Sequence, residues 1–215
     1  LDLLGSLTAI LFGVLILRSS GASYLFALLL FLVLGYLFTI YKYDYKRSIS
    51  AAEPNEGRRG VNPVVANGII PTFAAIAGNF YLFLGSLCSA LADTCATEIG
   101  VLYKDPVLVS TRERVKPGTR GAVSPLGELA AALASLLIAG GIILISLISS
   151  HYPMLGVMHA PAASYVLLAG VISGVVGCNV DSVLGAYLPL LSKEEVNVLG
   201  TLSGASIALG FSLLL

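Results

Sequence analysis

The hydrophobic positions of this chain fall into long apolar runs that are separated by shorter polar stretches. Runs close to the ~20 residues that cross a bilayer as a helix are typical of transmembrane segments. The pattern predicts seven segments, at residues 3–17, 23–41, 63–79, 80–100, 125–149, 162–186 and 196–215. Gly68 and Pro71 are expected to break or kink the third of them.

The composition agrees with a membrane protein. Apolar residues make up 57% of the chain and charged residues 11%, whereas soluble domains carry roughly 25% charge. We therefore predict an all-α fold, a polytopic helical bundle with about seven transmembrane helices in the lipid bilayer. Residues 1–215 are expected to form one bundle, which begins with two helices and a basic loop over residues 1–60. The formal net charge of zero gives no indication of a nucleic-acid partner, and the oligomeric state stays open.

The basic residues predict the orientation of the bundle. Eleven of the 12 Lys and Arg residues fall in loops on one side, and only Arg18 falls on the other. Because basic loops face the cytoplasm, this side and the N-terminus are predicted to be cytoplasmic. The run from Lys42 to Arg47 is interpreted as a topology signal alone. The eleven residues are Lys42, Lys46, Arg47, Arg58, Arg59, Lys104, Arg112, Arg114, Lys116, Arg120 and Lys193.

Three acids, Asp93, Glu98 and Asp181, lie inside predicted spans. An ionised group near the centre of a membrane helix costs about 2.5–3.5 kcal/mol, so these side chains are expected to face one another, a cation or a polar ligand. All three fall in the predicted cytoplasmic half, and so do Asn67 and Asn197. They therefore predict one site that opens to the cytoplasm. The alternative is that the acids pair with Arg and only hold the bundle together.

The residue types at this site favour a magnesium ion. Asp93, Thr94 and Glu98 form part of a polar stripe on one helix, and Asp181 is expected to join them. Carboxylates and hydroxyls are hard oxygen ligands, and Mg²⁺ typically takes one or two carboxylates together with substrate phosphates. We therefore predict Mg²⁺ as the cofactor, without assigning which acid binds metal and which acts as a base.

A basic, glycine-containing stretch precedes the fifth segment. Arg and Lys side chains bind phosphate, and the free backbone N–H groups of a helix that starts at Ser124-Pro125 form an anion site. The stretch therefore predicts a phosphate site, although the basic residues could also be topology signals alone. With the two asparagines, the predicted phosphate-binding residues are Asn67, Arg112, Arg114, Lys116, Gly118, Thr119, Arg120, Gly121, Ser124 and Asn197.

These motifs resemble a family of integral membrane proteins that includes the plant phytyl-phosphate kinase. The resemblance covers residues 60–215 and rests mainly on Asp93-Thr94 with Glu98-Ile99-Gly100, and on the stretch from Gly118 to Gly127. Shorter matches are Ala66-Asn67-Gly68, Val180 to Ala186, and Val196-Asn197. Arg120 departs from the family pattern, which has Asn or Asp there, and Tyr187-Leu188-Pro189 replaces an end that contains Gln.

The resemblance implies a catalytic core over residues 61–215, with Asp93, Glu98 and Asp181 as catalytic residues. The implied reaction transfers a phosphoryl group from a nucleoside triphosphate to an isoprenoid monophosphate such as phytyl or geranylgeranyl phosphate. CTP is the expected donor, because related lipid kinases use it. The alternatives are a membrane transporter or carrier with a cytoplasm-facing acidic cation site, and a scaffold or assembly factor. A transporter would need polar groups in the outer half of the membrane, and no acid is predicted there.

Overall fold

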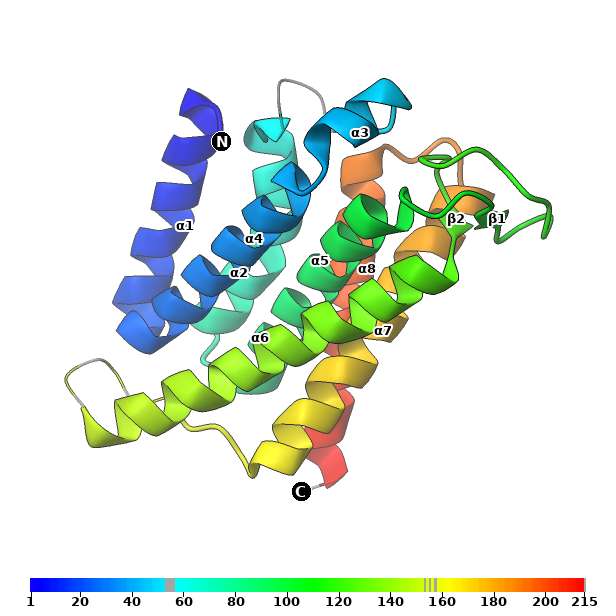
Figure 1. The fold of residues 1–215 in the computed structure, drawn as a ribbon. Helices are drawn as coiled ribbons and strands as arrows, with labels where there is room; N and C mark the ends of the chain where they lie inside the picture. Colours follow the sequence, from blue (N-terminus) through cyan, green and yellow to red (C-terminus); the bar gives the residue numbers. More distant parts are fainter. Residues whose placement is uncertain (53–56, 153, 155, 157, 215) are drawn as a thin grey trace.

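All seven predicted segments are helices in the computed structural model, which describes residues 1–52, 57–152, 154, 156 and 158–214. A short extra helix, α3, and two strands of two residues lie in the polar loops (Figure 1). The predicted all-α membrane bundle is therefore confirmed. The elements are α1 (Leu3–Ser20), α2 (Ala22–Ile40), α3 (Tyr43–Ser48), α4 (Val61–Ile76), α5 (Phe80–Gly100), β1 (Val107–Leu108), β2 (Ala122–Val123), α6 (Pro125–His151), α7 (Ala163–Tyr187), α8 (Lys193–Phe211) and the 3₁₀ turn η3 (Ser212–Leu214).

Among the described residues, five helices are long and apolar enough to cross a membrane: α1, α2, α5, α6 and α7. α4 is apolar but has only 16 residues, and α8 begins with charged residues. Of the expected break or kink in the third segment, the break is wrong, because α4 continues through Gly68 and Pro71 as one helix. A proline within a helix removes one backbone hydrogen bond.

Side-chain caps explain where several helices begin. Asp2 accepts a hydrogen bond from the Gly5 N–H at the start of α1, and Asn79 accepts one from the Leu82 N–H at the start of α5. Ser192 and Glu195 form a reciprocal capping box at the start of α8. Each of these side chains satisfies a backbone N–H that has no partner within the helix. Short polar stretches between apolar runs thus fix the ends of the helices.

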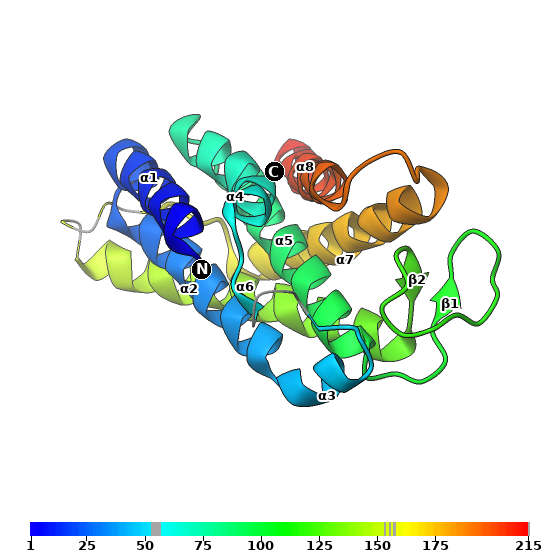
Figure 2. The ribbon, with the colours of Figure 1, turned by 90° about the horizontal axis from the view of Figure 1, so that it is seen from above.

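Helix α5 lies at the centre of the bundle, with α2, α4, α6, α7 and α8 around it (Figure 2). Small residues let α5, α7 and α8 approach one another closely. A Cβ added at Gly204 would lie 2.5 Å from Ser89 Cβ and 2.9 Å from Gly85 O, and Ser89 Oγ donates to Gly200 O at 3.0 Å. Small residues that allow backbones to approach are typical of membrane helix interfaces. This packing fixes the three helices that carry the predicted acids and amides.

The loops rich in Lys and Arg gather at one end of the bundle. The start of α1, the helix α3, the β1–β2 segment and the turn between α7 and α8 all lie at the top of Figure 1, and the C-terminus lies at the other end. The two strands are antiparallel, with Val107 opposite Val123 and Leu108 opposite Ala122. The predicted separation of basic loops from the opposite end is therefore present in the fold.

Candidate functional site

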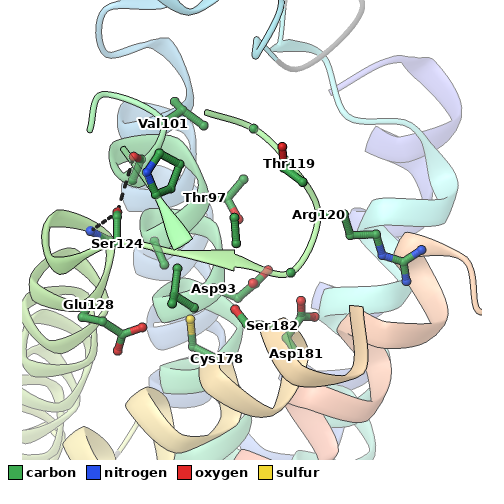
Figure 3. A pocket seen from close by; sticks show the side chains of 18 of the residues that line it. Asp93, Thr97, Val101, Thr119, Arg120, Ser124, Glu128, Cys178, Asp181 and Ser182 are labelled. Atoms are coloured by element: carbon green, nitrogen blue, oxygen red, sulfur yellow. Dashed lines mark hydrogen bonds between the residues drawn. The ribbon is translucent and has the colours of Figure 1, made fainter. Parts of the chain in front are cut away.

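A cavity of about 220 Å³ lies between α5, α6, α7 and α8 at the end of the bundle that carries the basic loops (Figure 3). The loop from Gly118 to Ser124 forms one of its walls. The polar side chains that α5, α7 and α8 contribute to it are Asp93, Thr97, Asp181, Ser182, Lys193 and Asn197. Residues that are far apart in the sequence thus meet in one polar chamber, which we call the loop cavity.

A second cavity, of about 240 Å³, lies next to the loop cavity and shares Asp93, Thr97, Lys193 and Asn197 with it. We call it the α4 cavity, because α4 contributes Pro63 and Asn67. Its further polar residues are Arg59, Thr94, Glu98 and Glu194. The two cavities therefore lie on either side of Asp93 and Asn197. Asn67, Asp93, Asp181 and Asn197 also line a small cleft between α4, α5, α7 and α8, together with Ser89, Gly177, Gly200 and Thr201.

Asp181 and Asn197 join α7 to α8 at this boundary. With its amide oriented so that the nitrogen faces acceptors, Asn197 Nδ2 donates to Asp181 Oδ2 at 3.1 Å and to Lys193 O at 2.9 Å. A carboxylate that accepts an amide N–H still has lone pairs for another partner. Asp181 therefore has a fixed orientation and can contact a ligand as well.

The loop of the first cavity needs its glycines. Gly118 and Gly121 have φ values of 86° and 75°, in the left-handed region that favours glycine. A Cβ at Gly121 would also lie 2.6 Å from the Ala186 backbone N, so this glycine lets the loop rest on α7. Ser124 then begins α6 by accepting a hydrogen bond from the Gly127 N–H at 3.1 Å. The first backbone N–H groups of α6 thus lie beside the cavity, an arrangement that favours anions.

Arg120 connects this loop to the turn before α8. Its guanidinium donates to Leu191 O at 2.7 Å and to Ser192 O at 3.2 Å. Figure 3 shows its side chain directed out of the loop cavity, although the residue contributes to the wall. A guanidinium has five N–H donors, so it can hold two carbonyls and still contact an anion. In this structure Arg120 positions the loop.

The other predicted cations lie farther from the chamber. Arg112, Arg114 and Lys116 are exposed between β1 and β2 and line neither cavity. The pairing of β1 with β2, and a bridge between Val107 and Arg114, hold this segment outside the helices. Among the described residues, the cations that line one or both cavities are Lys193, Arg59 and Arg120. Lys193 and Arg59 were not assigned to the site from the sequence, because nothing in the pattern distinguishes them from other basic loop residues.

Glu98 is part of a buried ion pair. Lys46 Nζ lies 2.5 Å from Glu98 Oε2 and also donates to Thr39 O and Phe38 O. The interpretation of the run from Lys42 to Arg47 as a topology signal alone is therefore wrong for Lys46, whose side chain is fully buried. No pattern in the sequence indicates this burial, because a lysine in a basic loop is ordinarily solvated. The second oxygen, Glu98 Oε1, is buried and has no hydrogen-bond partner among the described residues.

Two further polar residues line the cavities, Asn67 the α4 cavity and Glu128 the loop cavity. Asn67 is 5% exposed and donates to Pro63 O at 3.1 Å, while its Oδ1 has no hydrogen-bond partner within the described part of the chain. Glu128 lines the loop cavity and accepts a hydrogen bond from Asn179 Nδ2 at 2.9 Å. Buried acceptors without a donor are rare in proteins, and each one calls for an explanation such as a bound ion or water.

The donor set fits Mg²⁺ in the manner typical of phosphate-transferring sites. Across the described ranges, no group of three or more His, Cys, Asp or Glu side chains could enclose a metal ion. Mg²⁺ is ordinarily held by one or two carboxylates, several waters and substrate phosphates. Asp93 and Asp181 supply the carboxylates, and Thr97 and Ser182 supply neighbouring hydroxyls. Asn67 Oδ1 and Glu98 Oε1 each lack a hydrogen-bond donor among the described residues, and both residues line the α4 cavity.

Comparison with known proteins identifies integral membrane proteins as relatives of this chain. Residues 1–207 match the family described as integral membrane protein DUF92. An uncharacterized membrane protein of Methanocaldococcus jannaschii is 31% identical over 217 residues, which cover 96% of this chain and 84% of the relative. An uncharacterized membrane protein of Synechocystis is 33% identical over 77% of this chain and 64% of its own length.

A chloroplast protein of Arabidopsis thaliana, Protein VTE6, is 30% identical over 95% of this chain. The match spans 63% of that plant protein, so this chain covers less than two thirds of its length. No solved structure matches the chain. The resemblance to a family of integral membrane proteins that the sequence indicated is confirmed by the family match and by the plant relative. The chain therefore belongs to the integral membrane protein family DUF92.

Proposed function

We propose that this protein transfers the γ-phosphoryl group of a nucleoside triphosphate, with CTP as the expected donor, to an isoprenoid monophosphate in the membrane. The proposal rests on the loop cavity and the α4 cavity, which adjoin each other at Asp93. Asp93 lines both cavities, and Asp181 lines the loop cavity, where the N-terminus of α6 is suited to phosphate. A donor phosphate in the loop cavity and an acceptor phosphate in the α4 cavity would thus meet at Asp93.

The reaction needs positioning and charge neutralisation more than covalent chemistry from the protein. An oxygen of the acceptor phosphate attacks the γ-phosphorus. The bond between that phosphorus and the β,γ-bridging oxygen breaks, which releases a nucleoside diphosphate and forms the prenyl diphosphate. The acceptor phosphate is already anionic, so the transfer requires no base to receive a proton, as an alcohol acceptor would. Cationic side chains matter more at such a site.

The residues that line the two cavities would each bind or orient one of the reacting groups. The Gly118–Ser124 loop and the start of α6 would hold the phosphates of the nucleotide, and Arg120 would keep the loop in place. Lys193 lines both cavities and would lie near the transferred group. Asp93 and Asp181 would hold Mg²⁺, which neutralises charge on the triphosphate when bound. Asn197 orients Asp181 through its amide.

The proposal is tested by incubating purified protein in lipid vesicles with Mg²⁺, γ-labelled nucleoside triphosphates and a panel of prenyl alcohols and prenyl monophosphates. We expect label in prenyl diphosphates, with monophosphates as the acceptors. Label in products from the alcohols alone would make the protein an alcohol kinase. If label reaches no isoprenoid, the transporter hypothesis takes precedence.

A further inference from the structure

We propose that the aliphatic chain of the isoprenoid phosphate lies in an apolar groove between α1, α2 and α4, with its phosphate group beside Arg59 and Asn67. This inference rests on the proposed function, and it assigns the acceptor to the side of the α4 cavity. The groove is lined by Ala9 and Phe12 of α1, Leu28, Phe31 and Leu32 of α2, and Val64 and Gly68 of α4.

The groove and the α4 cavity adjoin each other. Arg59, Pro63 and Asn67 line both of them, but the groove itself holds only about 40 Å³, so a hydrocarbon chain would enter it only when side chains of α1 move outward. The α4 cavity is polar and ends at Asp93, whereas the groove has almost only apolar side chains below Arg59 and Asn67. This change from polar to apolar lining matches a molecule with an anionic head and a hydrocarbon tail.

The direction of the groove also suits a membrane lipid. Arg59 directly precedes α4 at the basic end of the bundle, and Gly68 and Phe12 lie about two turns into their helices. A phosphate beside Arg59 would therefore lie at the level of the basic loops, where a charged headgroup belongs. The tail would extend toward the middle of the membrane, where apolar side chains and lipid exclude water.

The packing of α1 gives the tail a way in from the bilayer. Only 11% of the apolar window of α1 is buried, against 67% for α5, so most of α1 faces outward. Gly68 lets the Phe12 ring pack directly against α4, since an added Cβ would lie 2.6 Å from Phe12 Cδ2. A tail that enters the groove would have to displace this ring. A loosely packed outer helix can separate from α2 at small energetic cost, because lipid replaces its contacts.

The charges of the α4 cavity are compatible with a phosphate at its outer end. Arg59 lies at the junction with the groove, and Arg59 Nη2 donates weakly to Thr39 Oγ1 at 3.4 Å. Glu98 lies deeper and its charge is balanced by Lys46. A guanidinium binds phosphate oxygens through two parallel N–H donors. The acceptor phosphate would then lie between Arg59 and Asp93, which lines both cavities.

Photo-crosslinking tests this assignment without any variant. The purified chain in phosphatidylcholine vesicles is irradiated with geranylgeranyl phosphate that carries a diazirine on its terminal isoprene unit, and labelled peptides are mapped by mass spectrometry. We expect label on the groove-facing residues of α1, α2 and α4. Excess unlabelled geranylgeranyl phosphate should remove it, whereas excess phosphatidic acid should not. Absence of label, label confined to α5–α8, or equal competition by phosphatidic acid would overturn the proposal.

A matched pair of variants on α1 tests the same groove by kinetics. Ala9→Phe fills the groove, and Ile10→Phe adds an aromatic ring at a neighbouring residue that is 61% exposed. We expect Ala9→Phe to raise the KM for geranylgeranyl phosphate roughly tenfold or more. The KM values for the nucleotide and for isopentenyl phosphate, whose chain is too short to reach Ala9, should not change. Ile10→Phe should behave as the unaltered protein, and Ala9→Leu serves if the larger ring prevents folding.

The two tests separate this inference from the proposed function. Transfer activity combined with label outside the groove would refute the groove and leave the kinase proposal standing. Specific label in the groove without any transfer would refute the kinase proposal and leave an isoprenoid-phosphate site. An equal rise in KM for long and short acceptors in Ala9→Phe would show that the variant disturbs the phosphate site, and would count against the groove.

Discussion

Lys46 and Glu98 form a buried ion pair that fastens α3, in the first basic loop, to the central helix α5. Their charged atoms lie 2.5 Å apart, with Lys46 fully buried and Glu98 3% exposed. The pair leaves Glu98 Oε1 without a hydrogen-bond partner in the described structure. The loop thus contributes a charge to the interior, beside the cavity that Glu98 lines.

Replacing Lys46 by Met should destabilise the protein by about 3–5 kcal/mol, because it leaves the Glu98 carboxylate buried without its counter-charge. Thermal unfolding in detergent, followed by circular dichroism, measures the effect. Arg47→Met is the matched control, since Arg47 is exposed in the same short helix. Adding Glu98→Gln to Lys46→Met should restore part of the lost stability. Equal melting temperatures for Lys46→Met and Arg47→Met would show that the pair contributes nothing to folding.

Asp93→Asn and Asp181→Asn should abolish Mg²⁺-dependent nucleotide binding while the protein stays folded. Both side chains line the loop cavity, and neutralising an acid within a membrane helix does not hinder insertion. Calorimetric titration with the nucleotide, with and without Mg²⁺, measures the loss. Asp105→Asn, on an exposed turn outside both cavities, should bind as the unaltered protein does. Retained Mg²⁺-dependent binding in both variants would remove these acids from the metal site.

Arg120→Ala should weaken nucleotide binding by about 1.5–3 kcal/mol, the usual size of a hydrogen bond to a charged group. Its guanidinium holds Leu191 O and Ser192 O, so the Gly118–Ser124 loop should lose its position. Arg120→Lys should rescue little, because an ammonium cannot reproduce the planar fork of donors. Arg114→Ala should have a smaller effect, since Arg114 lies outside both cavities. The KM for the nucleotide reports all three variants, and an Arg114 effect as large as that of Arg120 would contradict this reading of the loop.

Cysteine labelling tests the predicted orientation. The native cysteines Cys88, Cys95 and Cys178 are buried, so we expect them to react little with the reagents and the signal to come from the added cysteines. A cysteine at Thr119, in the loop of the site, should react only with reagents that reach the cytoplasm. A cysteine at Met154, which is 91% exposed at the opposite end, should react only from outside. Reaction of both from one side would overturn the topology.

The sequence was sufficient for the helices and for most of the polar residues that line the two cavities. Apolar runs of spanning length identified all seven long helices, because in a bilayer nearly every span must be apolar. The costly acids Asp93 and Asp181, with Asn67 and Asn197, indicated the residues that meet in the two cavities. Their convergence follows from the small residues that bring α5, α7 and α8 together, such as Ser89 against Gly204.

What the sequence did not reveal depends on contacts between distant segments. In the sequence, nothing distinguishes Lys46 from its exposed neighbours. Its contact with Glu98 exists only because the loop folds back onto α5. Arg114 and Arg120 are six residues apart and of the same type, yet only Arg120 reaches the turn before α8. The difference arises because Gly118 and Gly121 turn the chain toward α7 after the exposed segment ends. Such tertiary contacts leave no periodic signal in the sequence.

The product that the unaltered protein makes decides whether it is a prenyl-phosphate kinase. Purified protein in vesicles is incubated with geranylgeranyl phosphate, CTP and Mg²⁺, and the lipids are analysed by mass spectrometry, with Asp181→Asn protein and a chelator-treated sample as controls. We expect geranylgeranyl diphosphate in amounts that rise with time, together with an equal amount of CDP, and neither product in the controls. No diphosphate from folded protein with any nucleoside triphosphate, or equal amounts with Asp181→Asn, would contradict this expectation.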